Sequence, residues 1–216
     1  MEKIKNNITE LVFIIDRSGS MSGLEGDTIG SFNSLIEKQK KVDGKCYVST
    51  VLFDHEQKVI HDREKLDNIK PLTDKDYYAR GCTALVDAIG LSVRHIANIH
   101  KYARREDVPQ RTMFIIITDG YENASRIFTV DRVRKMVEYE KKNYGWEFIF
   151  IGTNDVLETA ENFGIGRERA ATYNADSVGT QVAYDTFNDL VTYFRNDSQL
   201  APDWNRKITL DHESRK

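Results

Sequence analysis

Short apolar runs of strand length alternate along this chain with longer segments of helical period. The runs at 9–16, 111–118 and 146–152 are almost continuously apolar in the middle, which is typical of strands buried on both faces. The segments between them place apolar residues three and four positions apart, as amphipathic helices do. Ser22 and Glu25 fit the capping box that begins a helix. We expect helices over residues 22–42, 83–103, 129–144, 155–163 and 176–196.

Strands that alternate with helices predict right-handed crossovers and a mostly parallel sheet. Segments 45–54 and 57–62 are joined by the tight connection Asp54-His55-Glu56, so we expect them to pair antiparallel at one edge, and 170–173 to add a short edge strand. The predicted fold class is therefore α/β, with three layers in which helices cover both faces of the sheet. Residues 1–196 are expected to form a single domain, and residues 197–216, which lose the helical period, a mobile tail.

Charge and composition exclude several classes of protein. The 216 residues include 31 Lys and Arg against 34 Asp and Glu, a net charge of −3, whereas dedicated nucleic-acid binders are usually basic. The longest apolar runs, at 11–15 and 113–117, are far too short to span a bilayer. The first ten residues carry positive charge, but no apolar region of signal-peptide length follows them, so we expect no signal peptide. Two cysteines do not make a disulfide framework. We therefore expect a cytoplasmic protein that binds neither nucleic acid nor membrane.

Oxygen-bearing side chains gather where the predicted strands end. The first strand ends in a loop that carries Asp16, Ser18 and Ser20, and the run at 111–118 is followed by Asp119. Thr83 lies between them, where a long polar loop opens into a helix. Ligands of parallel α/β sheets bind beyond the carboxyl ends of the strands, so we expect these residues to meet there. Two carboxylates and three hydroxyls form an all-oxygen set, which suits a hard cation such as Mg²⁺ or Mn²⁺.

The order D-x-S-x-S, then a distant Thr, then a distant Asp resembles the metal-ion-dependent adhesion site of the von Willebrand factor A domain family. The residues that match by position are Asp16, Ser18, Ser20, Thr83 and Asp119. The resemblance covers roughly residues 9–196 and implies a Rossmann-like sheet with one antiparallel edge strand. One departure is Cys82, since smaller residues are commoner beside the threonine in the family.

The resemblance also implies a function. In the family, the aspartates often reach the metal through water, and the ion captures a Glu or Asp carboxylate of a partner protein. Mg²⁺ or Mn²⁺ is the expected ion, with Ca²⁺ as a third candidate. Stand-alone bacterial relatives resemble accessory proteins of AAA-type ATPases, metal-resistance systems or other intracellular assemblies. We therefore expect a protein-binding module that is not an enzyme.

Three other interpretations remain open at this point. The loop after the first strand could be an ordinary polar turn, and Thr83 could simply cap its helix. Asp16 could be the nucleophile of a Mg²⁺-dependent phosphatase or phosphotransferase, although Ser18 stands where haloacid-dehalogenase-like enzymes carry a second aspartate. The metal could also merely brace three loops of a structural domain. The five histidines lack the spacing of metal ligands.

Overall fold

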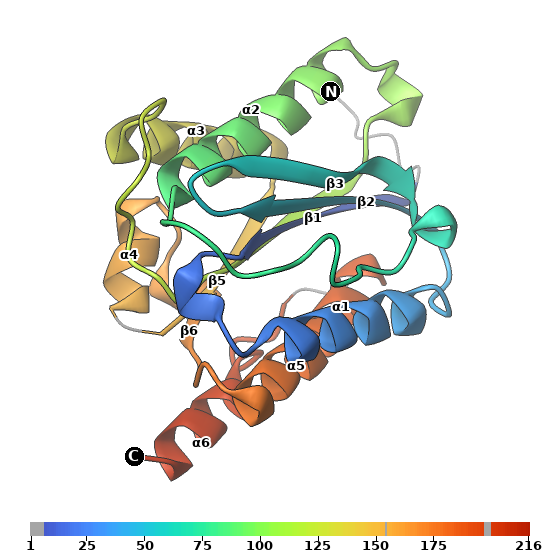
Figure 1. Ribbon diagram of the computed structural model, residues 1–216. Helices are drawn as coiled ribbons and strands as arrows, with labels where there is room; N and C mark the ends of the chain where they lie inside the picture. The colour runs from blue at the N-terminus through green and yellow to red at the C-terminus, as the bar shows by residue number, and fades with distance from the viewer. Residues whose placement is uncertain (1–6, 154, 197–199) are drawn as a thin grey trace.

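The computed structural model describes residues 7–153, 155–196 and 200–216 (Figure 1). Within these residues six strands form one sheet. The strands are β1 (Ile8–Asp16), β2 (Lys45–Phe53), β3 (Gln57–Lys65), β4 (Arg111–Ile117), β5 (Glu147–Gly152) and β6 (Ala170–Thr172). The helices are α1 (Glu25–Gln39), α2 (Leu85–Tyr102), α3 (Val130–Tyr144), α4 (Val156–Asn162), α5 (Ser177–Arg195) and α6 (Arg206–Ser214). No helix among the described residues is long and apolar enough to cross a membrane.

The order of the strands in the sheet is β3-β2-β1-β4-β5-β6. Every neighbouring pair is parallel except β2 and β3, which pair antiparallel at one edge. The predicted α/β class, with its antiparallel edge strand, is therefore confirmed. The parallel strands β1 and β4 lie at the centre, so the loops that follow them emerge side by side at one edge of the sheet.

Helices cover the sheet from both sides (Figure 1), with α1 and α5 on one face and α2 and α3 on the other. The alternation of side chains along β1 supplies both cores. Phe13 and Ile15 belong to the cluster under α1 and α5, whereas Val12 and Ile14 belong to the cluster under α2 and α3. The middle of a strand that is buried on both faces does not alternate between apolar and polar residues, which explains the continuous apolar run at residues 11–15.

Helix α1 begins later than the capping box indicated. Gly23 has a φ of +90°, so the chain between Ser22 and the helix is not helical, and Leu24 takes the N-cap position. The Glu25 carboxylate accepts a hydrogen bond from the backbone N–H of Gly23 at 2.7 Å. The buried side chains of Met21 and Leu24 fix this turn in the core, so tertiary packing outweighs the local capping signal.

Helix α6 occupies residues 206–214, where the sequence indicated no regular structure. Ile208 is buried against the core, and the indole N–H of Trp204 donates to the carbonyl of Glu168 at 2.8 Å. The amide of Asn205 donates to the carbonyl of Ala170 in β6 at 3.1 Å. The sequence pattern therefore missed this helix, whereas the mobility expected of residues 197–216 stays a prediction, and residues 197–199 lie outside the described part of the chain.

Candidate metal centre

The carboxyl ends of β1 and β4 place the first and last predicted ligands next to each other. In the parallel register Ile15 faces Ile117, so Asp16 and Thr118 follow at the same level. Asp16 is fully buried, and its two carboxylate oxygens accept separate hydrogen bonds. One comes from the backbone N–H of Ser18 at 2.7 Å, and the other from the hydroxyl of Thr118 at 2.6 Å. These two bonds fix the orientation of the carboxylate.

Burial dominates the electrostatics of both aspartates. It raises the pKa of Asp16 from 3.8 to about 6, although the hydrogen bonds from Thr118 and Ser18 oppose the shift. The negative charge of Asp119 adds a smaller upward contribution to the pKa of Asp16. The pKa of Asp119 is also raised by burial, against a hydrogen bond from Ser20. Two carboxyl groups that are costly to ionise lie together, and a bound cation would remove that cost.

The serine hydroxyls continue this network on the loop after β1. The two hydroxyl oxygens of Ser18 and Ser20 lie 3.0 Å apart, and the Ser20 hydroxyl donates to the Asp119 carboxylate at 2.5 Å. Ser18 is buried, whereas Ser20 is exposed to solvent. The loop thus presents one protected and one accessible oxygen beside the carboxylate of Asp119.

Three hydroxyls converge above Gly120, the residue after Asp119. A Cβ atom built on Gly120 would lie 2.7 Å from the Thr83 hydroxyl oxygen, 3.1 Å from that of Ser20 and 3.4 Å from that of Ser18. A side chain at Gly120 would therefore occupy the space that these oxygens surround. Helix α2 has Ala84 at its N-cap position and no side-chain capping bond, so Thr83 is not used as a helix cap. The structure thus brings all five predicted ligands together.

Backbone hydrogen bonds tie the three loops of the site to one another. The N–H of Gly19 donates to the carbonyl of Gly81 at 3.1 Å. Thr83 is held from the other side, because its N–H donates to the side-chain oxygen of Asn123 at 2.9 Å and its carbonyl accepts from the Asn123 N–H at 3.0 Å. Sequence reasoning missed Asn123 and Thr118 as supports of the site. An Asn or Thr in a loop has many local uses, so neither residue type gave a signal.

Asp87 is a third support that the sequence did not indicate. This buried carboxylate on α2 accepts hydrogen bonds from the backbone N–H groups of Arg126, Ile127 and Phe128, at distances from 2.7 to 3.1 Å. These groups belong to the loop that follows Asp119, so Asp87 fixes that loop against the helix.

Replacing Asp87 by Ala is expected to cost about 2 kcal/mol of unfolding free energy, because three backbone donors lose a charged acceptor. The loop that carries Asp119 and Gly120 should loosen, and the affinity for Mn²⁺ should fall with it. Urea unfolding and Mn²⁺ titration measure the two effects. Asp131→Ala, on the exposed surface of α3, serves as the matched control. Unchanged stability and affinity in Asp87→Ala would show that the loop is held by other contacts.

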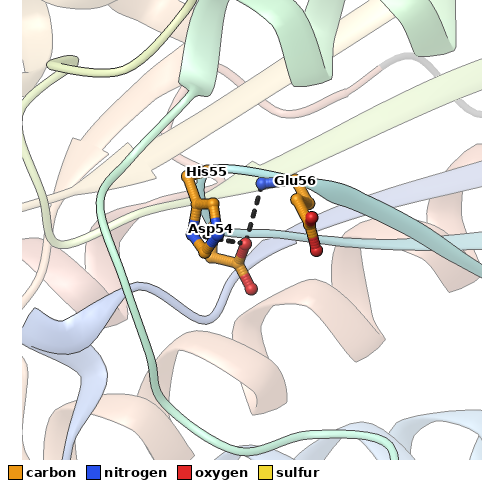
Figure 2. Close-up of side chains that lie close together, drawn as sticks. All are labelled: Asp54, His55 and Glu56. Carbon is orange, nitrogen blue, oxygen red and sulfur yellow. Dashed lines mark hydrogen bonds and ion pairs between the residues drawn. The ribbon is translucent and has the colours of Figure 1, made fainter.

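A second group of potential ligands lies at the turn between β2 and β3. Figure 2 shows Asp54, His55 and Glu56 side by side, and one potential ligand atom from each lies within 4.8 Å of the other two. The carboxylate of Asp54, however, contacts the guanidinium nitrogens of Arg17 at 2.9 Å and Arg80 at 2.8 Å. Glu56 is also paired with Arg80, at 2.8 Å. Two positive charges already compensate these carboxylates, so the group does not fit a cation.

This charged group instead supports the loops of the candidate metal centre. It anchors the buried side chain of Arg17, which lies between two of the predicted ligands in the sequence. The imidazole of His55 packs over Gly81, where a Cβ would lie 2.3 Å from the ring Nδ1. Gly81 also has a φ of +68°, so both its conformation and its surroundings require glycine.

Comparison with known proteins points to one family. The sequence model of the von Willebrand factor type A domain matches residues 10–188. None of the curated proteins matches the chain.

Three solved structures show the same fold. The von Willebrand factor domain of the type V pili tip protein Mfa5 from Porphyromonas gingivalis superposes with a TM-score of 0.62 at 11% identity, covering 89% of this chain and 98% of that one. Proximal thread matrix protein 1 from the mussel byssus, with a zinc-occupied MIDAS motif, superposes with a TM-score of 0.57 at 15% identity, covering 85% of this chain and 46% of that one. A von Willebrand factor type A protein from Catenulispora acidiphila superposes with a TM-score of 0.56 at 11% identity, covering 85% of this chain and 42% of that one. The chain thus spans less than half the length of the last two.

Proposed function

Because the chain belongs to the von Willebrand factor type A domain family, we propose that it is a protein-binding module that depends on a divalent metal ion. Domains of this family mediate contacts between proteins and are typically not enzymes. The observation that carries the proposal is the convergence of the Ser18, Ser20 and Thr83 hydroxyls beside the carboxylates of Asp16 and Asp119. These five residues would hold the ion.

The donor set favours Mg²⁺ or Mn²⁺, with Ca²⁺ as a third candidate. All five side chains offer oxygen, and no thiol or imidazole is among them, which suits a hard cation. The mussel protein carries zinc in its motif, so the ion used by this chain is a matter for measurement. Whether Asp16 and Asp119 contact the ion directly or through water is part of the same measurement.

The charges of the site explain why the partner would offer an acidic side chain. The charges of the two carboxylates only balance the charge of a divalent cation, and the three hydroxyls are neutral. The bound ion would therefore still attract a further anionic oxygen. Ser20 is exposed, and the space beside it opens to solvent, so a carboxylate of another protein can approach from this side. We propose that a Glu or Asp of the partner completes the coordination of the metal.

The phosphatase interpretation receives less support from the geometry. A nucleophilic aspartate must present a free oxygen to the substrate. Asp16 is fully buried, and both of its carboxylate oxygens accept hydrogen bonds, from the backbone of Ser18 and the hydroxyl of Thr118. This arrangement suits a fixed ligand or a positioning group better than a nucleophile. The wider proposal, an accessory role in a cytoplasmic bacterial assembly of the AAA-type ATPase or metal-resistance kind, rests on family resemblance alone.

The proposal is tested by capturing partners in Mn²⁺ and releasing them with EDTA. Partners so released from cell extract are titrated against the protein, with their acidic residues changed to Gln one at a time. One such change is expected to weaken binding by about 2 kcal/mol or more, because a carboxylate bound to the ion acts as a hot spot. Thr83→Ala should cause a similar loss, while Thr209→Ala on α6, the same chemical change far along the chain, should cause none.

Two outcomes would contradict the proposal. Binding that persists in EDTA and in Thr83→Ala would place the interface elsewhere on the molecule. A metal-dependent interaction in which no single acidic residue of the partner matters would favour a metal that only braces the loops. The circular dichroism spectrum of Thr83→Ala verifies that the variant is folded.

A further inference from the structure

A small pocket opens directly beside the candidate metal centre. It has a volume of about 220 Å³ and lies between the carboxyl ends of β4 and β5, helix α4 and the loop that follows β4. Its apolar walls come from Leu85, Val130, Phe150, Val156 and Phe163. Four of these side chains are almost completely buried, all except Val130, so the walls are fixed by the core.

The pocket and the metal centre share residues. Thr118, Asp119 and Gly120 line the pocket, and all three also belong to the metal centre. Asp119 carries one of its carboxylates, the Thr118 hydroxyl donates to the Asp16 carboxylate, and the site hydroxyls converge above Gly120. A peptide that places a carboxylate at the metal can therefore place a nearby side chain at the pocket. Extended chains advance about 3.3 Å per residue, so the neighbouring side chain lies one to three positions away.

The size of the pocket suits one side chain. Pockets for drug-sized ligands usually measure about 300–1,000 Å³, which is more than the 220 Å³ available here. A dry apolar cavity of about 150 Å³ is enough to bind benzene. The pocket therefore has room for a single Leu, Ile, Met or Phe side chain.

The charges at the rim indicate that this side chain is not acidic. Asp155 and Glu158 are both exposed at the start of α4, next to the pocket-lining residues Val156 and Thr159. The hydroxyl of Tyr121 donates to the Asp155 carboxylate at 3.3 Å, and Tyr121 itself lines the pocket. A second acidic side chain would meet these carboxylates, whereas an apolar one gains contact with the walls and repels nothing.

The same loop adds exposed apolar surface around the mouth. Tyr121 is 58% exposed and Ile127 is 56% exposed, although both are large apolar or aromatic side chains. Val130, which lines the pocket, is also exposed. Exposed apolar residues beside a binding site are typical of a protein-interaction surface, and Tyr121 and Val130 line the pocket itself.

We propose that this pocket selects the partner by taking one uncharged apolar side chain, one to three residues from the acidic residue that reaches the metal. The proposal rests on the proposed function, since the metal-bound carboxylate sets the position of the peptide. The recognised element is then a short motif of an acidic residue and a nearby Leu, Ile, Met or Phe. The metal makes binding depend on the ion, and the pocket discriminates among the peptides that contain an acidic residue.

A library of random peptides displayed on phage tests both steps at once. Phages are bound to the immobilised protein in Mn²⁺ and eluted with EDTA, and the sequences of the eluted peptides are compared. The expected pool shows a constant Asp or Glu and an apolar residue at a fixed spacing of one to three positions. Thr159→Trp, which places an indole in the pocket, should keep the acidic residue in its pool and lose the apolar one.

Glu161→Trp is the matched control, because it adds the same side chain at an exposed position of α4 that neither lines the pocket nor belongs to its charged rim. A synthetic peptide from the wild-type pool is expected to bind Thr159→Trp at least about tenfold more weakly, and Glu161→Trp with little change. Thr159→Leu, a smaller filling of the same space, replaces Thr159→Trp if that variant does not fold.

The outcomes separate the two proposals. The role of the pocket would be overturned by a wild-type pool that has the constant acidic residue but no preferred apolar residue near it, or a basic residue at the apolar position. Either result would leave the metal-dependent capture standing. Equal pools from the wild type and the folded Thr159 variant would do the same. If EDTA releases no peptides with a constant acidic residue, the proposed function itself fails, and the pocket inference fails with it.

Discussion

Thermal unfolding of the protein in saturating Mn²⁺ or Mg²⁺ is expected at a temperature roughly 5–10 °C above that in EDTA. An ion that binds only the folded state stabilises it by RT ln(1 + [L]/Kd), which is about 2.7 kcal/mol at a hundredfold excess over Kd. The five proposed ligands come from three loops that meet only in the folded chain, so the unfolded state offers no comparable site. A series of metal concentrations, followed by differential scanning calorimetry, measures the shift.

The double variant Ser18→Ala/Ser20→Ala removes two of the converging hydroxyls and should abolish this shift. Ser22→Ala is the matched control, since Ser22 lies on the same loop, is exposed and is not one of the converging hydroxyls. The control should respond to metal as the wild type does. Equal shifts in the double variant and the wild type would show that the ion binds elsewhere, and the assignment of these ligands would be wrong.

Asp16→Asn is expected to stabilise the metal-free protein at pH 7 by up to about 3 kcal/mol. Burial raises the pKa of Asp16 from 3.8 to about 6, so the wild type at neutral pH carries a buried charge whose ionisation is costly in the folded state. Asparagine keeps the size of the side chain and its carbonyl oxygen, which can still accept a hydrogen bond from Ser18 or Thr118. The variant should also lose its stabilisation by metal.

The stability difference between Asp16→Asn and the wild type depends on pH, and the raised pKa of Asp16 sets the direction of that dependence. Between about pH 4 and pH 6 the folded wild type holds a proton on Asp16 that the unfolded chain has released. This group therefore lowers the stability of the wild type as pH rises through that range, and its contribution is constant above it. The stability difference between variant and wild type should grow from near zero at pH 4 to its full value above pH 6. Urea unfolding in EDTA across this range measures the difference.

A loss of stability in Asp16→Asn at pH 7 would mean that the carboxylate contributes more to the fold through its hydrogen bonds than its burial costs. If the variant is stabilised but still responds to Mn²⁺, the cost of burying the Asp16 charge is confirmed, and Asp16 is not part of the metal site. The two results are distinct, because one is measured in EDTA and the other as a response to the ion.

Much of the fold follows from patterns that are local in the sequence. The apolar run that became β1 is buried on both faces, as its lack of alternation indicated, and the three-residue link between β2 and β3 enforced their antiparallel pairing. Helix α3 ends within the predicted range and is followed by Gly145 with a φ of +69°, a common way to stop a helix. The candidate ligands could be predicted for the same reason, because strand ends locate them without any knowledge of side-chain contacts.

The sequence by itself therefore determined the class of fold, the edge of the sheet at which we propose that a metal ion binds and the five residues that meet there. Only the tertiary structure decided how those residues are held. The bond from Thr118 to Asp16 joins residues 102 positions apart, and the bonds from the loop after Asp119 to Asp87 span about 40 positions. The pocket beside Asp119 and the docking of α6 arise in the same way. Such contacts depend on strand register and helix placement, which are properties of the whole packed core, whereas periodicity and turn chemistry report only on a residue's near neighbours.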